Sequence, residues 1–232
     1  PTWHPNGEYI YYSKKPMFPD KNGSRYYDLY EYDISSKKEK RLTIGARSFS
    51  PVFINSDSSI AFIATKDGSQ DIYIYDLSEK KITQITDFND RPIISSLDFN
   101  KYDSSIYFDI STHHYRDIGK ISLIDTTFNM VLSNDLWDER NVTFGSNGSI
   151  IYADDKSGIF NLYLIDEKNK KQGYVTNVLG GVFMPDMSDN GRLVYSLYHD
   201  GAYKIALLDT LEIIEDDLVG YSNNYYQKNA NL

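Results

Sequence analysis

Few side chains in this sequence have the type and spacing of a metal site. It contains four His and no Cys, and His113 and His114 are the only adjacent His pair. Neighbouring residues of a strand point to opposite faces, so this pair could chelate a metal only from a loop. Asp98, Asn100 and Asp103 carry the oxygen ligands that Ca²⁺ prefers, but the sharp-turn Gly and the bidentate Glu of a calcium loop are missing. We therefore predict no metal site and no cofactor, an exposed loop for the His pair and a hairpin turn for the acidic segment.

No catalytic motif is recognisable either. The G-x-S-x-G nucleophile elbow of a Ser hydrolase is absent, as are the phosphate-binding G-x-x-x-x-G-K-[ST] and the zinc-binding H-E-x-x-H. The adjacent acids Asp154-Asp155 and Asp216-Asp217 could act as general acid and base. We interpret them as solvated charge, because nothing in the sequence indicates the burial that shifts a pKa. The sequence predicts no catalytic residue and no enzymatic activity within the chain.

The elements that would position any site are short strands in a repeat. Strand-like segments that end in Asp recur at spacings of 43, 49, 41 and 43 residues, with their last residues at Asp33, Asp76, Asp125, Asp166 and Asp209. We interpret these Asp residues as turn formers, because Asp accepts hydrogen bonds from the following main chain. A second apolar segment lies upstream of each, after a turn such as H-P-N-G or S-D-N-G, which is typical of hairpins. A further short segment follows most of the Asp residues and commonly ends in Thr, as in R-L-T and Q-I-T.

Four strands in about 43 residues, repeated five times, predict a β-propeller, since propeller blades are four-stranded units of this length. A β-sandwich is the competing fold, but it does not require one pattern in five copies. We predict an all-β fold, a propeller or propeller fragment of five four-stranded antiparallel blades, over residues 1–46, 47–90, 91–139, 140–181 and 182–210. Residues 211–232 are predicted to be a linker or tail to a downstream region. Residue 1 is Pro, and we expect the chain to be part of a longer protein.

The amino-acid composition limits the classes of partner and the kind of fold that we expect for this chain. Of the 232 residues, 41% are hydrophobic and 21 are Tyr, which favours strands with a buried core. The formal net charge of -9 would repel a phosphate backbone, so nucleic acid is not an expected partner. No apolar run approaches the roughly 18 residues of a membrane helix, so we predict no membrane span in this chain.

The repeat has its fullest form between Ser50 and Thr86, where Asp67-Gly68 precedes D-I-Y and Q-I-T closes the unit. This pattern resembles the TolB-type, WD40-like propeller repeat of bacteria, and residues 1–210 can be laid on it. None of the five turns keeps the S-P-D-G of that family. The fifth copy, from Gly180, is similar to the last blade of propellers that precede an outer-membrane barrel of the surface-antigen type. That resemblance implies a periplasmic or outer-membrane associated location and a covalently linked downstream domain.

Differences between the copies suggest where a partner binds. The loop between the second and third strands is long in copy one, from Lys14 to Tyr27, and expanded in copy three, from Ser111 to Gly119. Insertions in repeat proteins tend to cluster on the binding face, and aromatic and Arg side chains are common interface anchors. With the connection that carries Trp137, these loops predict a binding surface that comprises Phe18, Tyr26, Tyr27, His113, His114, Tyr115, Arg116, Trp137 and Arg140.

The sequence thus favours a non-enzymatic scaffold that presents this loop face to a protein or polysaccharide at the bacterial cell envelope. The alternative is an accessory or gating propeller of a hydrolase or peptidase. Prolyl-oligopeptidase-like enzymes, which carry a propeller of this kind, hold their catalytic triad in a separate domain, and such a domain would lie outside this chain.

Overall fold

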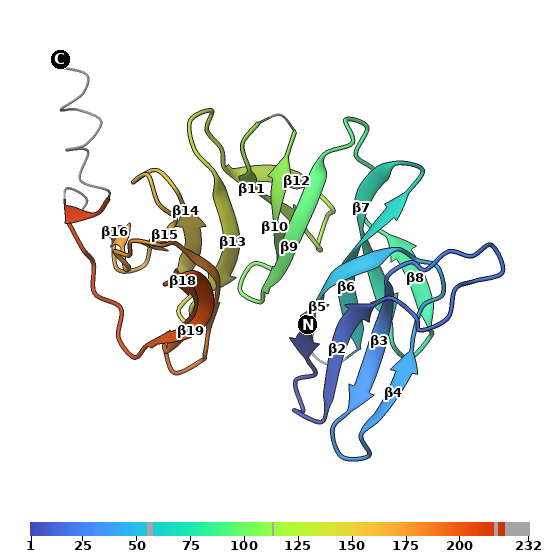
Figure 1. The fold of residues 1–232 in the computed structure, drawn as a ribbon. Helices are drawn as coiled ribbons and strands as arrows, with labels where there is room; N and C mark the ends of the chain where they lie inside the picture. Colours follow the sequence, from blue (N-terminus) through green and yellow to red (C-terminus); the bar gives the residue numbers. More distant parts are fainter. Residues whose placement is uncertain (55–57, 113, 216–217, 221–232) are drawn as a thin grey trace. The chain divides into compact units, whose positions relative to one another are not determined.

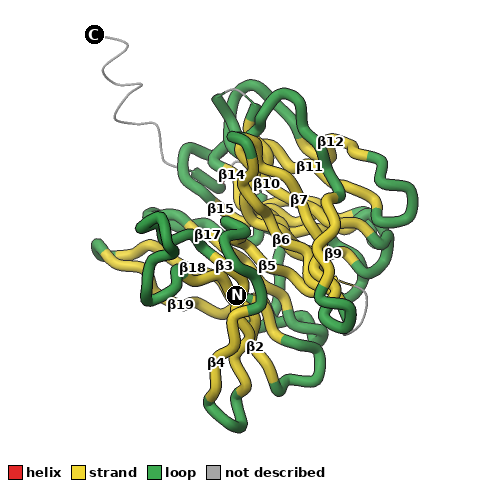
Figure 2. The backbone as a smooth tube through the Cα atoms, turned by 90° about the vertical axis from the view of Figure 1, so that its right-hand side faces the viewer, coloured by secondary structure: helices red, strands yellow, loops and turns green. Residues whose placement is uncertain are grey.

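The computed structural model describes residues 1–54, 58–112, 114–215 and 218–220. These residues form strands in five antiparallel sheets, and Figure 2 shows strands and loops with no helix among them. The predicted fold class is confirmed: the chain is an all-β propeller of five blades. Among the predicted features, His113, the turn that begins at Asn55, Asp216-Asp217 and the tail beyond Gly220 lie outside the described residues.

Each blade is an antiparallel meander in which consecutive strands are neighbours (Figure 1). Blade one contains β1 (Thr2–Trp3), β2 (Tyr9–Lys14), β3 (Asp28–Asp33) and β4 (Lys38–Arg41). Blade two contains β5 (Ser48–Ile54), β6 (Ser59–Lys66), β7 (Ser69–Asp76) and β8 (Lys81–Gln84). Blade three contains β9 (Ile93–Asn100), β10 (Ser105–Ser111), β11 (Asp117–Ser122) and β12 (Phe128–Leu132). Blade four contains β13 (Glu139–Phe144), β14 (Ile150–Asp154), β15 (Asn161–Asp166) and β16 (Lys171–Tyr174). In the described residues, blade five has three strands, β17 (Val182–Met187), β18 (Leu193–His199) and β19 (Ala202–Leu208).

The chain divides into two compact units. Unit 1 comprises residues 1–114 and 118–131, and unit 2 comprises residues 115–117 and 132–232. In unit 1, Ile63 and Ile72 of blade two pack with Ile94, Ile106 and Phe108 of blade three. The exposed fraction of these five side chains is at most 1%. Burying each aliphatic side chain contributes roughly 1.5–3 kcal/mol, so these blade-to-blade contacts form the core of the unit.

Unit 2 has a core of the same construction. Ile151 and Leu162 of blade four pack against Val182 and Leu193 of blade five, and all four are fully buried. Within unit 1, both faces of blade two are covered by neighbouring sheets, which explains why β6 is apolar at consecutive positions rather than at alternate ones.

Hydrogen bonds to the first residues of the third strand explain why a Thr recurs at the end of the repeat. We call this Thr, the acidic or amide side chain that it binds and their hydrogen bonds the lock. In blade two, the Thr86 hydroxyl donates to Asp71 Oδ1 at 3.0 Å and accepts from the Ile72 N–H at 2.9 Å. The same Asp71 oxygen accepts from the Phe88 N–H at 2.9 Å. The carboxylate and the hydroxyl therefore satisfy buried main-chain groups and hold the strand that leads to the next blade.

The lock recurs at the same positions of blades one and four. Asp28 with Thr43 forms it in blade one, and Asn161 with Thr176 forms it in blade four, where an amide oxygen replaces the carboxylate. In blade five the position of Asp71 is occupied by Lys204, on a strand that is an edge of its sheet in the described residues.

The predicted turn role is confirmed for four of the Asp residues, each of which accepts a hydrogen bond from a main-chain N–H group two or three residues later: Asp33, Asp76, Asp125 and Asp166. Asp33 Oδ1 and Asp76 Oδ1 each accept hydrogen bonds from main-chain N–H groups two and three residues later. These bonds lower the pKa of Asp33 to about 2. The assignment of Asp125 to the same repeat position is wrong. The Leu123 N–H donates to the Ser104 carbonyl, just as the Leu77 N–H of blade two donates to the Ser58 carbonyl. Ser122, the residue before Leu123, is therefore the counterpart of Asp76, the residue before Leu77.

The chain after β19 turns back to blade four. The Ile214 N–H donates to the Tyr174 carbonyl at 2.8 Å, and the two residues form an isolated bridge. Gly173 allows this approach, because a Cβ at that position would lie 2.7 Å from the Ile213 side chain. This segment therefore extends blade four rather than pairing with β19.

Candidate binding site

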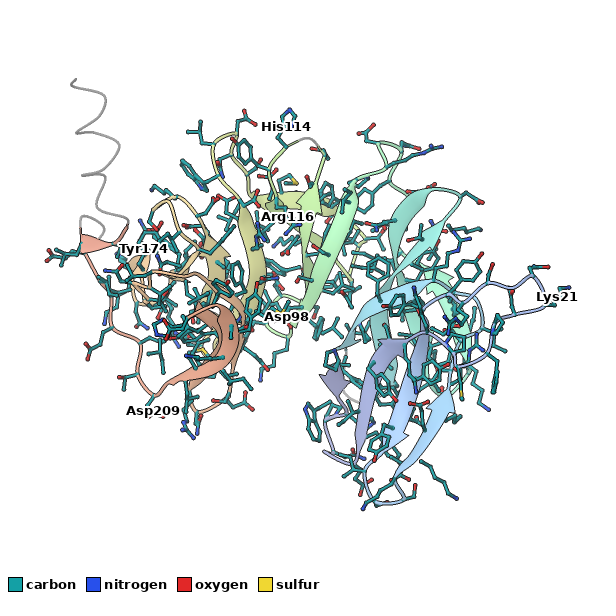
Figure 3. All side chains as sticks on the ribbon, in the orientation of Figure 1. Lys21, Asp98, His114, Arg116, Tyr174 and Asp209 are labelled. Atoms are coloured by element: carbon teal, nitrogen blue, oxygen red, sulfur yellow. The ribbon has the colours of Figure 1, made fainter. Side chains whose placement is uncertain are left out.

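The loop between β2 and β3 projects from blade one in Figure 1, and Lys21 lies near its tip in Figure 3. Met17 and Phe18 are 79% and 74% exposed, and Tyr27 is 47% exposed. Contiguous exposed apolar side chains are uncommon on soluble proteins and usually mark a contact. Phe18 and Tyr27 are thus exposed on this loop, and their binding role stays a prediction.

Two cations order the base of this loop. The guanidinium of Arg47 lies 4.2 Å from the ring centre of Tyr26, and Lys15 Nζ lies 5.1 Å from that of Tyr27. Hydrogen bonding with Ser24, followed by the bond and charge of Arg47, lowers the pKa of Tyr26 below its ordinary value. Cation–π contacts of this kind fix the orientation of the two rings.

The predicted residues of the loop between β10 and β11 are exposed at its tip. His114 is exposed there (Figure 3), and Tyr115 is 39% exposed. The main chain of Arg116 is anchored at both ends: its N–H donates to Asp138 Oδ1 at 2.9 Å, and its carbonyl accepts from the Glu139 N–H at 2.8 Å. The loop is thus tied to the connection between β12 and β13.

Trp137 lies in that connection and is partly buried. Its indole N–H donates to Glu139 Oε1 at 2.9 Å, and Lys156 Nζ lies 5.4 Å from its ring centre. Trp137 therefore also supports blade four, in addition to any contact with a partner.

Arg140 differs from the prediction, which placed it in the connecting loop. Because β13 begins at Glu139, Arg140 is a strand residue. Its guanidinium pairs with Asp138 and lies 4.0 Å from the ring centre of Phe160. The position in a loop is wrong because the blade begins one residue earlier than its pattern suggests, and the binding role of Arg140 stays a prediction.

The structure brings some of the predicted residues together. Tyr115, Arg116, Trp137 and Arg140 belong to unit 2, where Asp138 contacts both Arg116 and Arg140. Phe18, Tyr26 and Tyr27 belong to unit 1 and form a separate group. The convergence of the two groups into one surface stays a prediction.

Next to Trp137 lies a pair of buried carboxyl groups that sequence reasoning did not identify. Glu139 and Asp154 are directly opposite each other on β13 and β14, and they are only 5% and 2% exposed. Glu139 Oε1 accepts from Asn134 Nδ2 at 2.6 Å as well as from Trp137, while its Oε2 is buried with no hydrogen-bond partner among the described residues. Asp154 Oδ1 accepts from the Tyr174 hydroxyl at 2.7 Å.

Burial is the main cause of the unusual acidity of these groups. It raises the pKa of Glu139 to about 7, with the charges of Asp117 and Asp154 adding to the effect and the bonds from Trp137 and Asn134 opposing it. Burial also raises the pKa of Asp154 and, with Asp135 and Asp138, that of Asp117. Glu139 can therefore exchange a proton near neutral pH beside the Trp137 loop.

The interpretation of Asp154 as solvated charge is wrong. It ends the strand I-I-Y-A-D, whose residues are buried on both faces, so its side chain is enclosed by blade four. The apolar run from Ile150 to Ala153, directly before it, is the sequence feature that could have indicated this burial. In the described residues, no group of three or more His, Asp or Glu side chains could hold a metal ion.

The comparison with solved structures shows which known fold this chain has. TolB from Acinetobacter baumannii superposes with a TM-score of 0.69 at 20% sequence identity, over 87% of this chain and 50% of the TolB chain. A TolB-type protein from Agrobacterium tumefaciens superposes with a TM-score of 0.72 at 12% identity, over 90% of this chain and 76% of the other. The fold is that of the TolB β-propeller.

The propeller is also similar to part of a larger enzyme. A puromycin-hydrolyzing peptidase from Mycobacterium tuberculosis has a TM-score of 0.67 at 8% identity, over 89% of this chain and 35% of the peptidase. The propeller chain spans about half of the Acinetobacter TolB and about a third of this peptidase. No sequence-family model matches the propeller chain, and no curated protein matches it. In the part of the chain that the structure describes, no helix is long and apolar enough to cross a membrane.

Proposed function

We propose that this propeller is a non-catalytic binding module that holds a protein or polysaccharide partner through its long loops at the bacterial cell envelope. The observation that carries the proposal is the loop between β2 and β3. It exposes Met17 and Phe18 almost fully, whereas the corresponding loop of blade two is reduced to Asp67-Gly68. A long loop with exposed apolar side chains on a rigid sheet is the usual form of a binding site on a repeat protein.

A matched pair of surface variants tests this proposal. The immobilised chain is exposed to a solubilised bacterial envelope fraction and, separately, to an array of envelope polysaccharides. The double variant Met17→Ser, Phe18→Ser is compared with Ile124→Ser, which removes an apolar side chain that is 81% exposed in the turn between β11 and β12. We expect wild type and Ile124→Ser to retain the same partner and the loop variant to lose it. Capture that is identical for all three chains, or absent for all three, contradicts the proposal.

A periplasmic or outer-membrane associated location is part of the same proposal and is supported by the likeness to TolB. Fractionation of cells that express an epitope-tagged, full-length gene product tests it. Recovery with a periplasmic or outer-membrane marker is expected, and recovery with a cytoplasmic marker would contradict it.

The second candidate function is an accessory or gating propeller of a hydrolase or peptidase. The likeness to a puromycin-hydrolyzing peptidase, of which the chain covers 35%, favours it. The coding sequence on either side of this segment distinguishes the two candidates. A G-x-S-x-G elbow in a following domain supports the peptidase arrangement, and its absence from the full gene contradicts it.

A further inference from the structure

A cleft of about 310 Å³ lies within blade two and the connection that follows β8. It is lined mainly by polar side chains, and all of its lining residues belong to unit 1. Three carboxylates line it, from Asp67, Asp71 and Asp87, together with two cations, from Lys66 and Arg91. The lining therefore has one carboxylate more than it has cations.

In blade one, an arginine neutralises the carboxylate at the position equivalent to Asp71. Asp28, the lock carboxylate of blade one, pairs through Oδ2 with Arg41 Nη2 at 2.5 Å. Arg41 Nε also donates to the Thr43 carbonyl at 2.9 Å, which holds the guanidinium in place. The lock of blade one is therefore complete within the chain.

Blade two lacks this cation. Gln84 stands opposite Tyr73 as Arg41 stands opposite Tyr30, so Gln84 occupies the position of the arginine. Its Nε2 donates to the Thr86 carbonyl at 2.7 Å, the equivalent of the bond that Arg41 Nε makes. Asp71 is only 3% exposed, and in the part of the chain that the structure describes no cation pairs with it.

Tyr73 provides an independent observation at the same cleft. It is only 8% exposed, and its hydroxyl is buried with no hydrogen-bond partner among the described residues. Burial and the nearby Asp71 raise its pKa, so the side chain stays a neutral hydroxyl. An unpaired buried hydroxyl that lines a cavity is expected to receive a hydrogen bond from whatever fills that cavity.

We propose that this cleft binds the guanidinium or ammonium group of a ligand, which takes the place that Arg41 fills in blade one. The bound cation donates hydrogen bonds to the carboxylate of Asp71 and to the hydroxyl oxygen of Tyr73. One positive group balances the excess carboxylate of the lining, and a guanidinium matches the planar geometry of a carboxylate. None of the residues that line the cleft belongs to the loop surface of the proposed function.

Titration calorimetry on the whole chain tests this site with three probes. Methylguanidine represents a free small cation, N-acetyl-arginine amide represents a basic side chain, and N-acetyl-citrulline amide is the neutral isostere. We expect saturable binding of at least one cationic probe and no binding of the citrulline probe. Stronger binding of N-acetyl-arginine amide than of methylguanidine indicates a peptide as the source of the cation, and the reverse indicates a free amine or guanidine.

The decisive variant is Gln84→Arg, which supplies the guanidinium from within the chain as blade one does. It is expected to weaken binding at least tenfold, and Tyr73→Phe, which removes only the hydroxyl, is expected to weaken it severalfold. Circular dichroism checks that each variant is folded. If Gln84→Arg does not fold, the affinity of Tyr73→Phe for the cationic probe is the test. Unchanged affinity in the folded variants, equal binding of the citrulline probe, binding of inorganic phosphate in place of the cations, or no saturable binding would each overturn the proposal.

Discussion

Glu139 and Asp154 face each other across the first two strands of blade four, and both carboxyl groups are buried. Ionising both carboxyl groups is unfavourable, mainly because burial removes water from each of them, and the charge of Asp154 adds to the effect on Glu139. The Trp137 indole N–H donates to Glu139, so the charge of this pair is coupled to a loop predicted to bind a partner.

The first prediction concerns the effect of pH on stability. The pKa of Glu139 is raised from 4.5 to about 7 in the folded chain, so the folded state binds a proton more tightly than the unfolded state does. The stabilisation is present below pH 4.5 and is lost as pH rises through about 7. We expect the melting temperature of unit 2 to fall between pH 5 and pH 8, as followed by tryptophan fluorescence, and Glu139→Gln to reduce this fall. Glu167→Gln, an exposed position in the same unit, is the control and should keep the wild-type profile.

The second prediction concerns the hydrogen bond that joins Trp137 to Glu139. This bond lowers the pKa of Glu139, opposing the effect of burial. Trp137→Phe keeps an aromatic ring but removes the N–H donor, so the pKa of Glu139 should rise further. NMR titration of the Glu139 side-chain carboxyl measures the shift. An unchanged or lower pKa in the variant would show that the indole does not hold the carboxylate.

The third prediction concerns the lock of blade two. Thr86→Val removes the hydroxyl that donates to Asp71 and accepts from the Ile72 N–H, leaving both groups buried without that partner. Leaving a buried polar group unpaired costs about 1–3 kcal/mol, and Thr86→Val should lower the free energy of unfolding by roughly this amount. Urea denaturation measures the loss. Thr86→Ser retains the hydroxyl and should cost less than Thr86→Val; an equal cost would contradict the stabilising role of the hydroxyl.

The fourth prediction compares equivalent residues of different blades. Ile72 of blade two is fully buried, whereas Ile205, at the same position of blade five, is 87% exposed. Ile72→Ala should cost about 2–5 kcal/mol, because it leaves a cavity between blades. Ile205→Ser should change the free energy of unfolding by less than about 0.5 kcal/mol. Chemical denaturation of both variants measures the difference, and a large loss from Ile205→Ser would show that this face is covered in solution.

The sequence by itself determined the fold, because a propeller is built from local information repeated in register. Short apolar segments, hairpin turns and the Asp at the end of the third strand of a blade, as at Asp33 and Asp76, act within one blade. They were recognisable without knowledge of any neighbour. The error at Asp125 arose because β11 ends in Ser122 rather than in Asp, while an Asp that also follows apolar residues stands three positions further on.

Only the tertiary structure decided which polar groups are enclosed. Burial depends on what a neighbouring strand or blade places against a side chain, and that is not encoded at the position itself. Asp154 and Asp155 are adjacent in sequence, yet one is enclosed by blade four and the other is partly exposed. Likewise, among the described residues Asp71 has no paired cation, because residue 84 is a Gln where blade one has Arg41. The consequence of that difference is visible only when strands β7 and β8 are paired.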